Sequence, residues 1–287
     1  MAQQSILVQR SFASELRALW AIARKEWVIF RRYPSWVLAV FIWPVLFPFG
    51  YIFTAKALGG PNGAALSSFR NLTGTADYVG FIVVGSVLWM WLNMTLWDVG
   101  MYLRGEQMHG TLESNWLCPT WRVSLMLGGA LTKLAVSLLF LSISLLEFRL
   151  IFGVRVTGGN VGLALLVLLL VIPTIHGIGI SFASLVLRFK EANAMVFLVR
   201  GVFMIFCGIT YPIAVLPAWM QSVAAVLPLT YAIRDIRAVV LANATFAEIR
   251  SDLLVLAAFA LVMPLLGYTI FYLTERRSRR TGDLGQY

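Results

Sequence analysis

Three ionisable side chains lie inside otherwise apolar stretches, and their positions suggest chemistry. Lys133, His176 and Arg200 each stand within a run of aliphatic and aromatic residues. A charge at the centre of a membrane helix costs at least about 2.5 to 3.5 kcal/mol, so we expect Lys133 and Arg200 to face protein or a water-filled cavity. All three residues either line a transport pathway or serve structure. Under the second interpretation the two cations pair between helices and His176 is a hydrogen-bonded packing residue rather than a proton relay.

Motifs for catalysis and metal binding are missing from the sequence. Its two histidines, His109 and His176, are too few for a multi-histidine zinc site. The patterns HExxH, GxSxG and GxxxxGKS/T do not occur, which leaves proteolysis, hydrolysis and P-loop nucleotide binding without support. Cys118 and Cys207 lie far apart and predict ordinary thiols. We therefore expect no catalytic residues, no metal and no cofactor bound by this chain.

Composition indicates a polytopic membrane protein made of helices. Of 287 residues, 60% are hydrophobic and only 13% are charged, which is too few charges to cover an aqueous surface. The apolar runs are continuous, whereas a barrel would alternate apolar and polar residues. The net charge of +10 is typical of basic residues that flank membrane spans, so nucleic acid is not expected as a partner.

The spacing of charges predicts an all-α protein with six transmembrane helices in a single domain over residues 1–287. The expected spans are 34–55, 78–97, 123–146, 163–187, 192–211 and 253–274. The fifth carries Arg200, and an alternative register begins it at Gly201 and leaves Arg200 in the cytosol. Prolines then interrupt an uncharged stretch, which predicts an external hairpin, re-entrant or at the membrane surface, within the loop 212–250.

The side of the membrane that holds both termini carries about twice as many Arg and Lys residues as the opposite side. This bias predicts cytoplasmic N- and C-termini in a cell membrane, with a bacterial plasma or inner membrane expected.

The segment 10–32 is predicted to form an amphipathic helix that lies in the cytoplasmic interface of the membrane. Its apolar stripe recurs at helical spacing and comprises Leu16, Leu19, Trp20, Ala23, Trp27 and Phe30. The bases Arg17, Arg24 and Lys25 avoid that stripe. Two interpretations remain open: a simple membrane anchor, or a helix that also contacts a partner protein.

The loop 104–122 is short, mixed in charge and expected on the cytoplasmic side. Thr111 is a candidate N-cap for a short helix over 112–116. This segment is either a connector that rests on the membrane or a helix that docks into a soluble partner.

Three segments of the chain resemble the ABC-2 type permeases, the membrane subunits of one class of ATP-binding-cassette exporters. The first is the loop just described, through Glu106, Gly110, Thr111, Leu112 and Glu113, followed by Pro119 and Arg122. The second is the basic N-terminal helix, which runs into Tyr33-Pro34 and a span that contains Trp43-Pro44. The third is similar to the family's external hairpin and contains Pro212, Pro217, Trp219 and Pro228.

The resemblance implies a half-transporter that dimerises, with itself or with a paralogue, and binds two ATPase subunits. ATP and Mg²⁺ would be bound by the ATPase. The seven loop residues named above would form the coupling contact, and the interface helix, with Arg17, Trp20, Arg24 and Trp27, would also touch the ATPase. The four hairpin residues would form an external gate. Here Gln107, Met108 and His109 replace the more charged residues usual before the Gly-Thr-Leu-Glu motif.

The predicted function is therefore an ATP-driven exporter of an amphipathic, lipid-like, drug-like or glycan substrate that works by alternating access. The alternative is an ion- or proton-coupled secondary transporter that uses Arg200, Lys133 and His176. The absence of an internal repeat favours the first reading. The sequence lacks the cluster of residues with catalytic spacing that a lipid-modifying enzyme would need.

Overall fold

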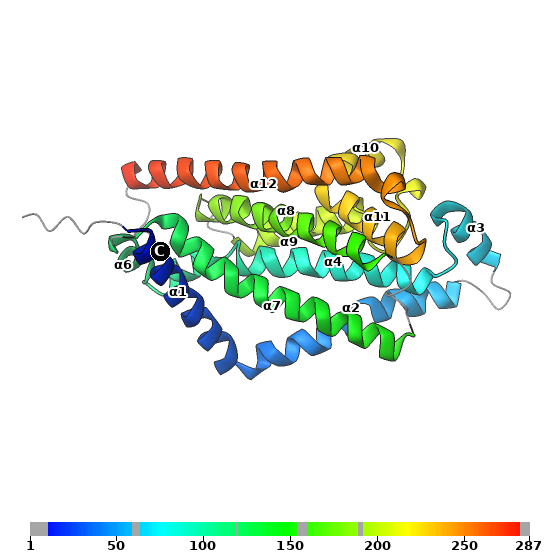
Figure 1. Ribbon diagram of the computed structural model, residues 1–287, viewed down its shortest axis with the longest axis horizontal. Helices are drawn as coiled ribbons and strands as arrows, with labels where there is room; N and C mark the ends of the chain where they lie inside the picture. Colours follow the sequence, from blue (N-terminus) through cyan, green and yellow to red (C-terminus); the bar gives the residue numbers. More distant parts are fainter. Residues whose placement is uncertain (1–10, 59–63, 119, 154–159, 189–191, 282–287) are drawn as a thin grey trace, which may run out of the picture.

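The computed structural model describes residues 11–58, 64–118, 120–153, 160–188 and 192–281. Within these ranges the chain is helical and has no β-strand, which confirms the predicted all-α class. Figure 1 shows the long helices side by side along one axis, with α1 and α6 at one end and α3 at the other. These two ends are called the α1 end and the α3 end below.

Helices α1 (Phe12–Arg32) and α2 (Pro34–Leu58) meet at an angle near Tyr33. The Ser11 hydroxyl caps α1 by accepting from the Ala13 N–H, 3.3 Å away. Pro34 begins α2 at a position where its missing N–H costs no helical hydrogen bond. The basic segment therefore forms a helix of its own, separate from the first apolar span.

Helix α4 (Tyr78–Asp98) is the innermost helix of the bundle and follows the short α3 (Ala64–Thr73). The Asp77 carboxylate caps its first turn by accepting from the Gly80 N–H at 2.8 Å. Most of its residues are buried, and it contacts α2, α7, α8, α9 and α11. Such a helix is apolar on all sides, as its sequence is.

At the α1 end the chain turns through α5 (Tyr102–Met108) and α6 (Leu112–Leu117) and returns as α7 (Arg122–Ile151). The predicted short helix after Thr111 is therefore confirmed. Its predicted cap is wrong, because the Thr111 side chain makes no capping hydrogen bond to α6.

Helices α8 (Val161–Arg188) and α12 (Phe246–Thr281) form the tightest pair of the bundle. A Cβ atom added to Gly177 of α8 would lie 2.4 Å from the Met263 carbonyl carbon and 2.5 Å from the Pro264 nitrogen. One added to Gly267 would lie 2.8 Å from the Gly177 oxygen. The two backbones therefore touch, which only small residues permit.

Five helices are long and apolar enough to cross a membrane: Pro34–Ala57, Tyr78–Asp98, Leu127–Ile151, Val161–Val186 and Phe246–Thr274. They coincide with five of the six predicted spans. The sixth, α9 (Ala192–Phe206), has only 15 residues. At 1.5 Å per residue it is roughly 22 Å long, less than the hydrocarbon core of about 30 Å. It begins at Ala192 and so includes Arg200, in contrast to the register that starts at Gly201.

The segment after α9 folds as a 3₁₀ turn, η1 (Ile213–Val215), and two short helices, α10 (Ala218–Val226) and α11 (Pro228–Leu241). Prolines separate these elements, since Pro212 precedes η1, Pro217 precedes α10 and Pro228 opens α11. Helix α11 packs against α4, α8 and α12, whereas α10 lies against α9.

Candidate coupling site

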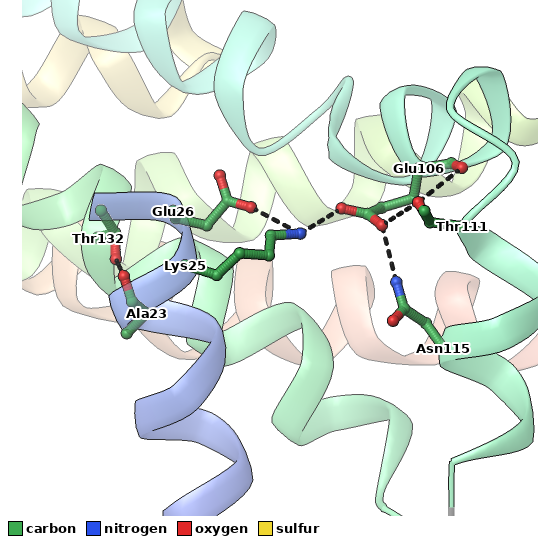
Figure 2. A network of polar contacts seen from close by, with 7 residues as sticks. All are labelled: Ala23, Lys25, Glu26, Glu106, Thr111, Asn115 and Thr132. Atoms are coloured by element: carbon green, nitrogen blue, oxygen red, sulfur yellow. Dashed lines mark hydrogen bonds and ion pairs between the residues drawn. The ribbon is translucent and has the colours of Figure 1, made fainter. Parts of the chain in front are cut away.

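Helix α1 packs on α7 through a face that carries buried acids rather than its aromatic stripe. Glu15, Ala23 and Glu26 are the buried residues of α1. The Thr132 hydroxyl of α7 donates to the Ala23 carbonyl at 2.8 Å (Figure 2). Close approach at this contact requires Gly128, because an added Cβ would lie 2.8 Å from the Ile22 Cβ.

Glu15 supplies the cap that α7 lacks in its own sequence. Trp121, the N-cap residue, makes no side-chain capping bond. The Trp121 N–H donates to both Glu15 carboxylate oxygens, at 3.1 and 3.0 Å, and the Ser124 hydroxyl donates to one of them at 2.7 Å. A carboxylate is favourable at a helix N-terminus because it pairs with free N–H groups and the positive end of the dipole. Helix α1 therefore fixes the start of α7.

A second carboxylate, Glu106 of α5, ties α1 to the loop helices (Figure 2). The Lys25 ammonium lies 2.7 Å from one Glu106 oxygen and 3.1 Å from a Glu26 oxygen. The other Glu106 oxygen accepts from the Thr111 hydroxyl at 2.6 Å and the Asn115 amide at 2.7 Å. One carboxylate thus joins α1, α5 and α6.

The electrostatics of this network favour the charged forms. Burial alone would raise the pKa of Glu106, but the hydrogen bonds from Lys25, Thr111 and Asn115 outweigh it and lower the pKa. Burial opposes the charge on Lys25 as well, yet its bond to Glu106 raises its pKa. Burial raises the pKa of the nearby Tyr102 phenol to about 12, so that group stays neutral. The ion pair is therefore intact at neutral pH.

Gly110 ends α5 in a left-handed conformation, with φ of 69°. Around it the Gly110 N–H donates to the Gln107 carbonyl and the Thr111 N–H to the Glu106 carbonyl, each bond 3.0 Å or shorter. This pattern is the Schellman motif, which satisfies the last carbonyls of a helix. The spacing of Glu106, Gly110 and Thr111 is therefore that of a helix C-terminus after which the chain turns back. The turn brings the Thr111 hydroxyl to the Glu106 carboxylate.

The other predicted coupling residues are placed only in part. Leu112 and Glu113 lie in α6 and Arg122 opens α7, but their side chains are not among those described. Pro119 lies outside the described residues. The coupling role of this set stays a prediction.

The predicted interface residues of α1 lie on its outer surface. Trp20 is 70% exposed and Trp27 is 39% exposed. Arg17 and Arg24 are exposed as well. Trp20 and Trp27 therefore face away from the bundle, where they can contact lipid or a partner protein. Two other members of the predicted stripe do not, because Ala23 is buried against α7 and Phe30 packs on the core.

The three membrane-depth candidates have local partners. The Lys133 ammonium pairs with Asp98 at 3.3 Å. The Arg200 guanidinium lies 4.9 Å from the Phe197 ring centroid and 5.5 Å from that of Trp89. His176 Nδ1 lies 2.9 Å from the Ile172 carbonyl, while its Nε2 has no partner among the described residues. The structure does not bring the three together.

The four predicted gate residues lie at the α3 end. Pro212, Pro217 and Pro228 separate the short elements there, and Pro228 is buried. Trp219 of α10 is 64% exposed, with its ring 6.1 Å from that of Phe206. Re-entry of this hairpin into the membrane stays a prediction.

The α3 end also holds two groups that sequence reasoning missed. Arg237 of α11 donates to the carbonyls of Phe81, Gly208 and Ile209, at 2.6 to 3.0 Å. Burial lowers the pKa of this guanidinium. Asp235 is fully buried, and neither of its carboxylate oxygens has a hydrogen-bond partner among the described residues. Burial and then the neighbouring Asp252 raise the pKa of Asp235 to about 7, against a smaller opposing effect of Arg234.

Glu15 and Glu26 were missed too, although a signal existed. They lie eleven residues apart, which is three helical turns, so both project from the same face of the helix. Trp20 and Trp27 lie roughly a third of a turn away from this face, so the recurring acids indicate a contact separate from the aromatic one. No comparable signal marks Arg237, because its partners are backbone carbonyls from distant segments.

Comparison with known families identifies the family of the chain. Residues 17–241, more than half of the chain, match the family model described as ABC-2 type transporter. No curated protein matches the sequence. The chain therefore belongs to the ABC-2 type transporter family and is a multi-pass membrane permease component of an ABC transporter.

Proposed function

We propose that this chain is the permease half of an ATP-driven exporter. Two copies, or one copy and a paralogue, would form the pathway, and two separate ATPase subunits would bind ATP and Mg²⁺. ATP closes the ATPase pair, which changes the relative stability of the inward- and outward-open states of the permease. This chain binds no nucleotide itself in the proposal.

The observation that carries the proposal is the network around Glu106. It fastens α1 to α5 and α6 through Lys25, Thr111 and Asn115. The Glu15 cap fastens the same α1 to the start of α7. A partner that moves α6 therefore moves α1 and α7 with it, which is what transmission from an ATPase requires.

In the proposed topology α9 serves as the sixth crossing, completed by the segment that leads into η1. The α1 end is cytoplasmic, which agrees with the bias of Arg and Lys toward that end. The α3 end, with the hairpin of α10 and α11, is then external. Helix α1 lies in the cytoplasmic interface, with Trp20 and Trp27 toward lipid or the ATPase.

The substrate in this proposal is amphipathic, and the class includes lipid-like, drug-like and glycan-linked molecules. The alternative, an ion- or proton-coupled carrier that uses Arg200, Lys133 and His176, gains no support from the two cations. Lys133 is neutralised by Asp98, and Arg200 rests on aromatic rings. These are the partners expected of residues that hold helices together.

The test begins with purification of the tagged chain in mild detergent from its native membrane. We expect a stoichiometric partner that carries the GxxxxGKS/T motif. In the reconstituted complex, Glu113→Arg should abolish transport while ATP hydrolysis continues. Arg70→Glu, a charge reversal at an exposed site of the α3 end, is the matched control and should leave both activities unchanged. A stable oligomer without an ATPase, or gradient-driven transport without ATP, would overturn the proposal.

A further inference from the structure

A cavity of about 470 Å³ opens at the α3 end, between α3, the η1 turn, α10 and α11. These elements gather at one end of the bundle, opposite α1 and α6 (Figure 1). The volume lies in the range of sites that take small molecules, roughly 300 to 1,000 Å³. The cavity belongs to a single chain and is remote from the coupling network.

The walls of the cavity are apolar on most sides and cationic at one point. Leu72, Phe81, Ile213 and Ala225 are among its apolar lining, and Arg237 supplies the charge. A second cation, Arg234, stands at the same wall, but it is already paired with Asp252 and lies 5.0 Å from the Tyr231 ring centroid.

Arg237 is held by three carbonyls and by the ring of Phe81, whose centroid lies 3.3 Å from the guanidinium carbon. Its three nitrogens donate to Phe81, Gly208 and Ile209, and no carboxylate of the described residues forms an ion pair with it. Carbonyl dipoles orient a guanidinium but do not neutralise its charge, so the cavity keeps a net positive charge beside an apolar wall. The bonds to carbonyls explain how Arg237 braces α4 and the end of α9. They leave open why a full charge is placed there.

A second polar group faces the same space. Thr230 of α11 lines the cavity, its residue is 4% exposed, and its hydroxyl has only the Cys207 thiol, a weak hydrogen-bonding group, as a side-chain partner. A buried hydroxyl with so weak a partner would gain a stronger hydrogen bond from a ligand acceptor. The hydroxyl and the guanidinium both donate, and both therefore fit an anion.

We propose that this cavity binds an amphipathic anion, with a phosphate or carboxylate group at Arg237 and Thr230 and a hydrocarbon chain along the wall of Leu72, Ile213 and Ala225. Guanidinium forms its strongest hydrogen bonds with these anions. The site stands independently of the proposed export function, because it needs neither ATP nor a partner subunit.

Binding is tested on the full chain in nanodiscs of phosphatidylcholine, with radiolabelled dodecyl phosphate as the probe. Dodecanol and inorganic phosphate serve as the tail-only and headgroup-only comparisons. We expect one saturable site per chain for dodecyl phosphate, with affinity at least about tenfold above that of either part alone. Nanodiscs that contain phosphatidylglycerol distinguish the source of the anion. Loss of the probe from them identifies a membrane lipid headgroup, and retention identifies a free amphiphile.

Variants are chosen to leave the brace of Arg237 intact. Ala225→Phe fills the cavity from α10 and should weaken binding by about tenfold or more. Ala218→Phe makes the same change at another exposed alanine of α10 that does not line the cavity, and should bind as the parent chain does. Thr230→Val keeps the side-chain shape, removes the hydroxyl and should weaken binding severalfold. Equal affinity for dodecanol or inorganic phosphate, or equal binding by the two phenylalanine variants, would overturn the proposal.

Discussion

The Lys25 ammonium of α1 lies 2.7 Å from the Glu106 carboxylate of α5, although the two residues are 81 positions apart in the sequence. Glu106 is mostly buried, whereas Lys25 keeps contact with solvent, with a side chain that is 44% exposed. The pair therefore sits at the boundary between the helices and their surroundings, where a bound partner would reach it. The pair stabilises the α1 end as part of a network, because the same carboxylate also accepts hydrogen bonds from Thr111 and Asn115.

Replacement of Glu106 by Gln should destabilise the α1 end. The variant keeps the shape but loses the charge, and it presents an N–H₂ group where a donor already points. We expect the free energy of unfolding to fall by about 1 to 3 kcal/mol. Thermal unfolding in detergent measures the change, and Arg24→Met, at an exposed neighbour of Lys25, is the control. A double-mutant cycle with Lys25→Met should be non-additive, and strict additivity would show that the ion pair contributes nothing.

Glu15→Gln should loosen the start of α7 without unfolding the bundle. The amide retains a single acceptor in place of two charged oxygens, so the Trp121 N–H and Ser124 hydroxyl lose part of their cap. We expect a loss of about 1 kcal/mol, the usual contribution of an N-cap. Hydrogen exchange of the amides at 121–126 should accelerate, while that of α12 stays unchanged. Unaltered exchange at 121–126 would contradict the capping role.

Asp235 should make stability depend on pH near neutrality. Its pKa is raised to about 7 in the folded chain, compared with about 3.9 when unfolded. The folded state therefore binds the proton more tightly than the unfolded state does. The stabilisation of the folded state by this proton is complete below pH 4 and is lost as the pH rises through 7. Asp235→Asn, a neutral analogue of the protonated acid, should flatten the dependence of Tm on pH between 5 and 8. A slope that persists in this variant would assign the titration to another group.

The contact between α8 and α12 should be sensitive to a single methyl group. Gly177→Ala places a Cβ within 2.5 Å of the Pro264 nitrogen, so the helices must separate. Overpacking of this kind costs about 1 to 3 kcal/mol. Gly201→Ala in α9, where nothing lies within 4 Å of the new Cβ, is the matched control and should be neutral or stabilising. Thermal unfolding of the two variants decides, and equal Tm values would contradict the close contact.

The five long helices could be predicted because the run of apolar residues that defines each one is a local property. The same reasoning placed the short helix after Thr111, since its start signal is local as well. This reasoning gave the Thr111 hydroxyl the wrong hydrogen bond, because the hydroxyl donates to Glu106 instead of capping α6. The N–H groups at the start of α6 and the Glu106 carboxylate are both close to Thr111 in sequence, and only the position of α1, through Lys25, orients the carboxylate toward Thr111.

The contacts between distant segments were beyond prediction. The amphipathic pattern of α1 identified two faces but assigned the protein contact to neither, and the acids proved to be buried while Trp20 is exposed. Nothing in the sequence marks Arg237, because it binds carbonyls 28 to 156 residues away. The length of α9 was overestimated, because its apolar run continues past Phe206 into residues that are not helical.

The central position of α4 has a mechanical consequence. Only residues 99–101 separate its end at Asp98 from α5, which carries Glu106. Within that link a Cβ on Gly100 would lie 2.5 Å from the Phe182 ring, so the connection is packed tightly against α8. A displacement of α1 that acts through Lys25 and Glu106 therefore has a short route to α4 at the axis of the bundle, in addition to the direct contact of α1 with α7. The packing of these three residues against α8 limits how far α5 can move independently of α4.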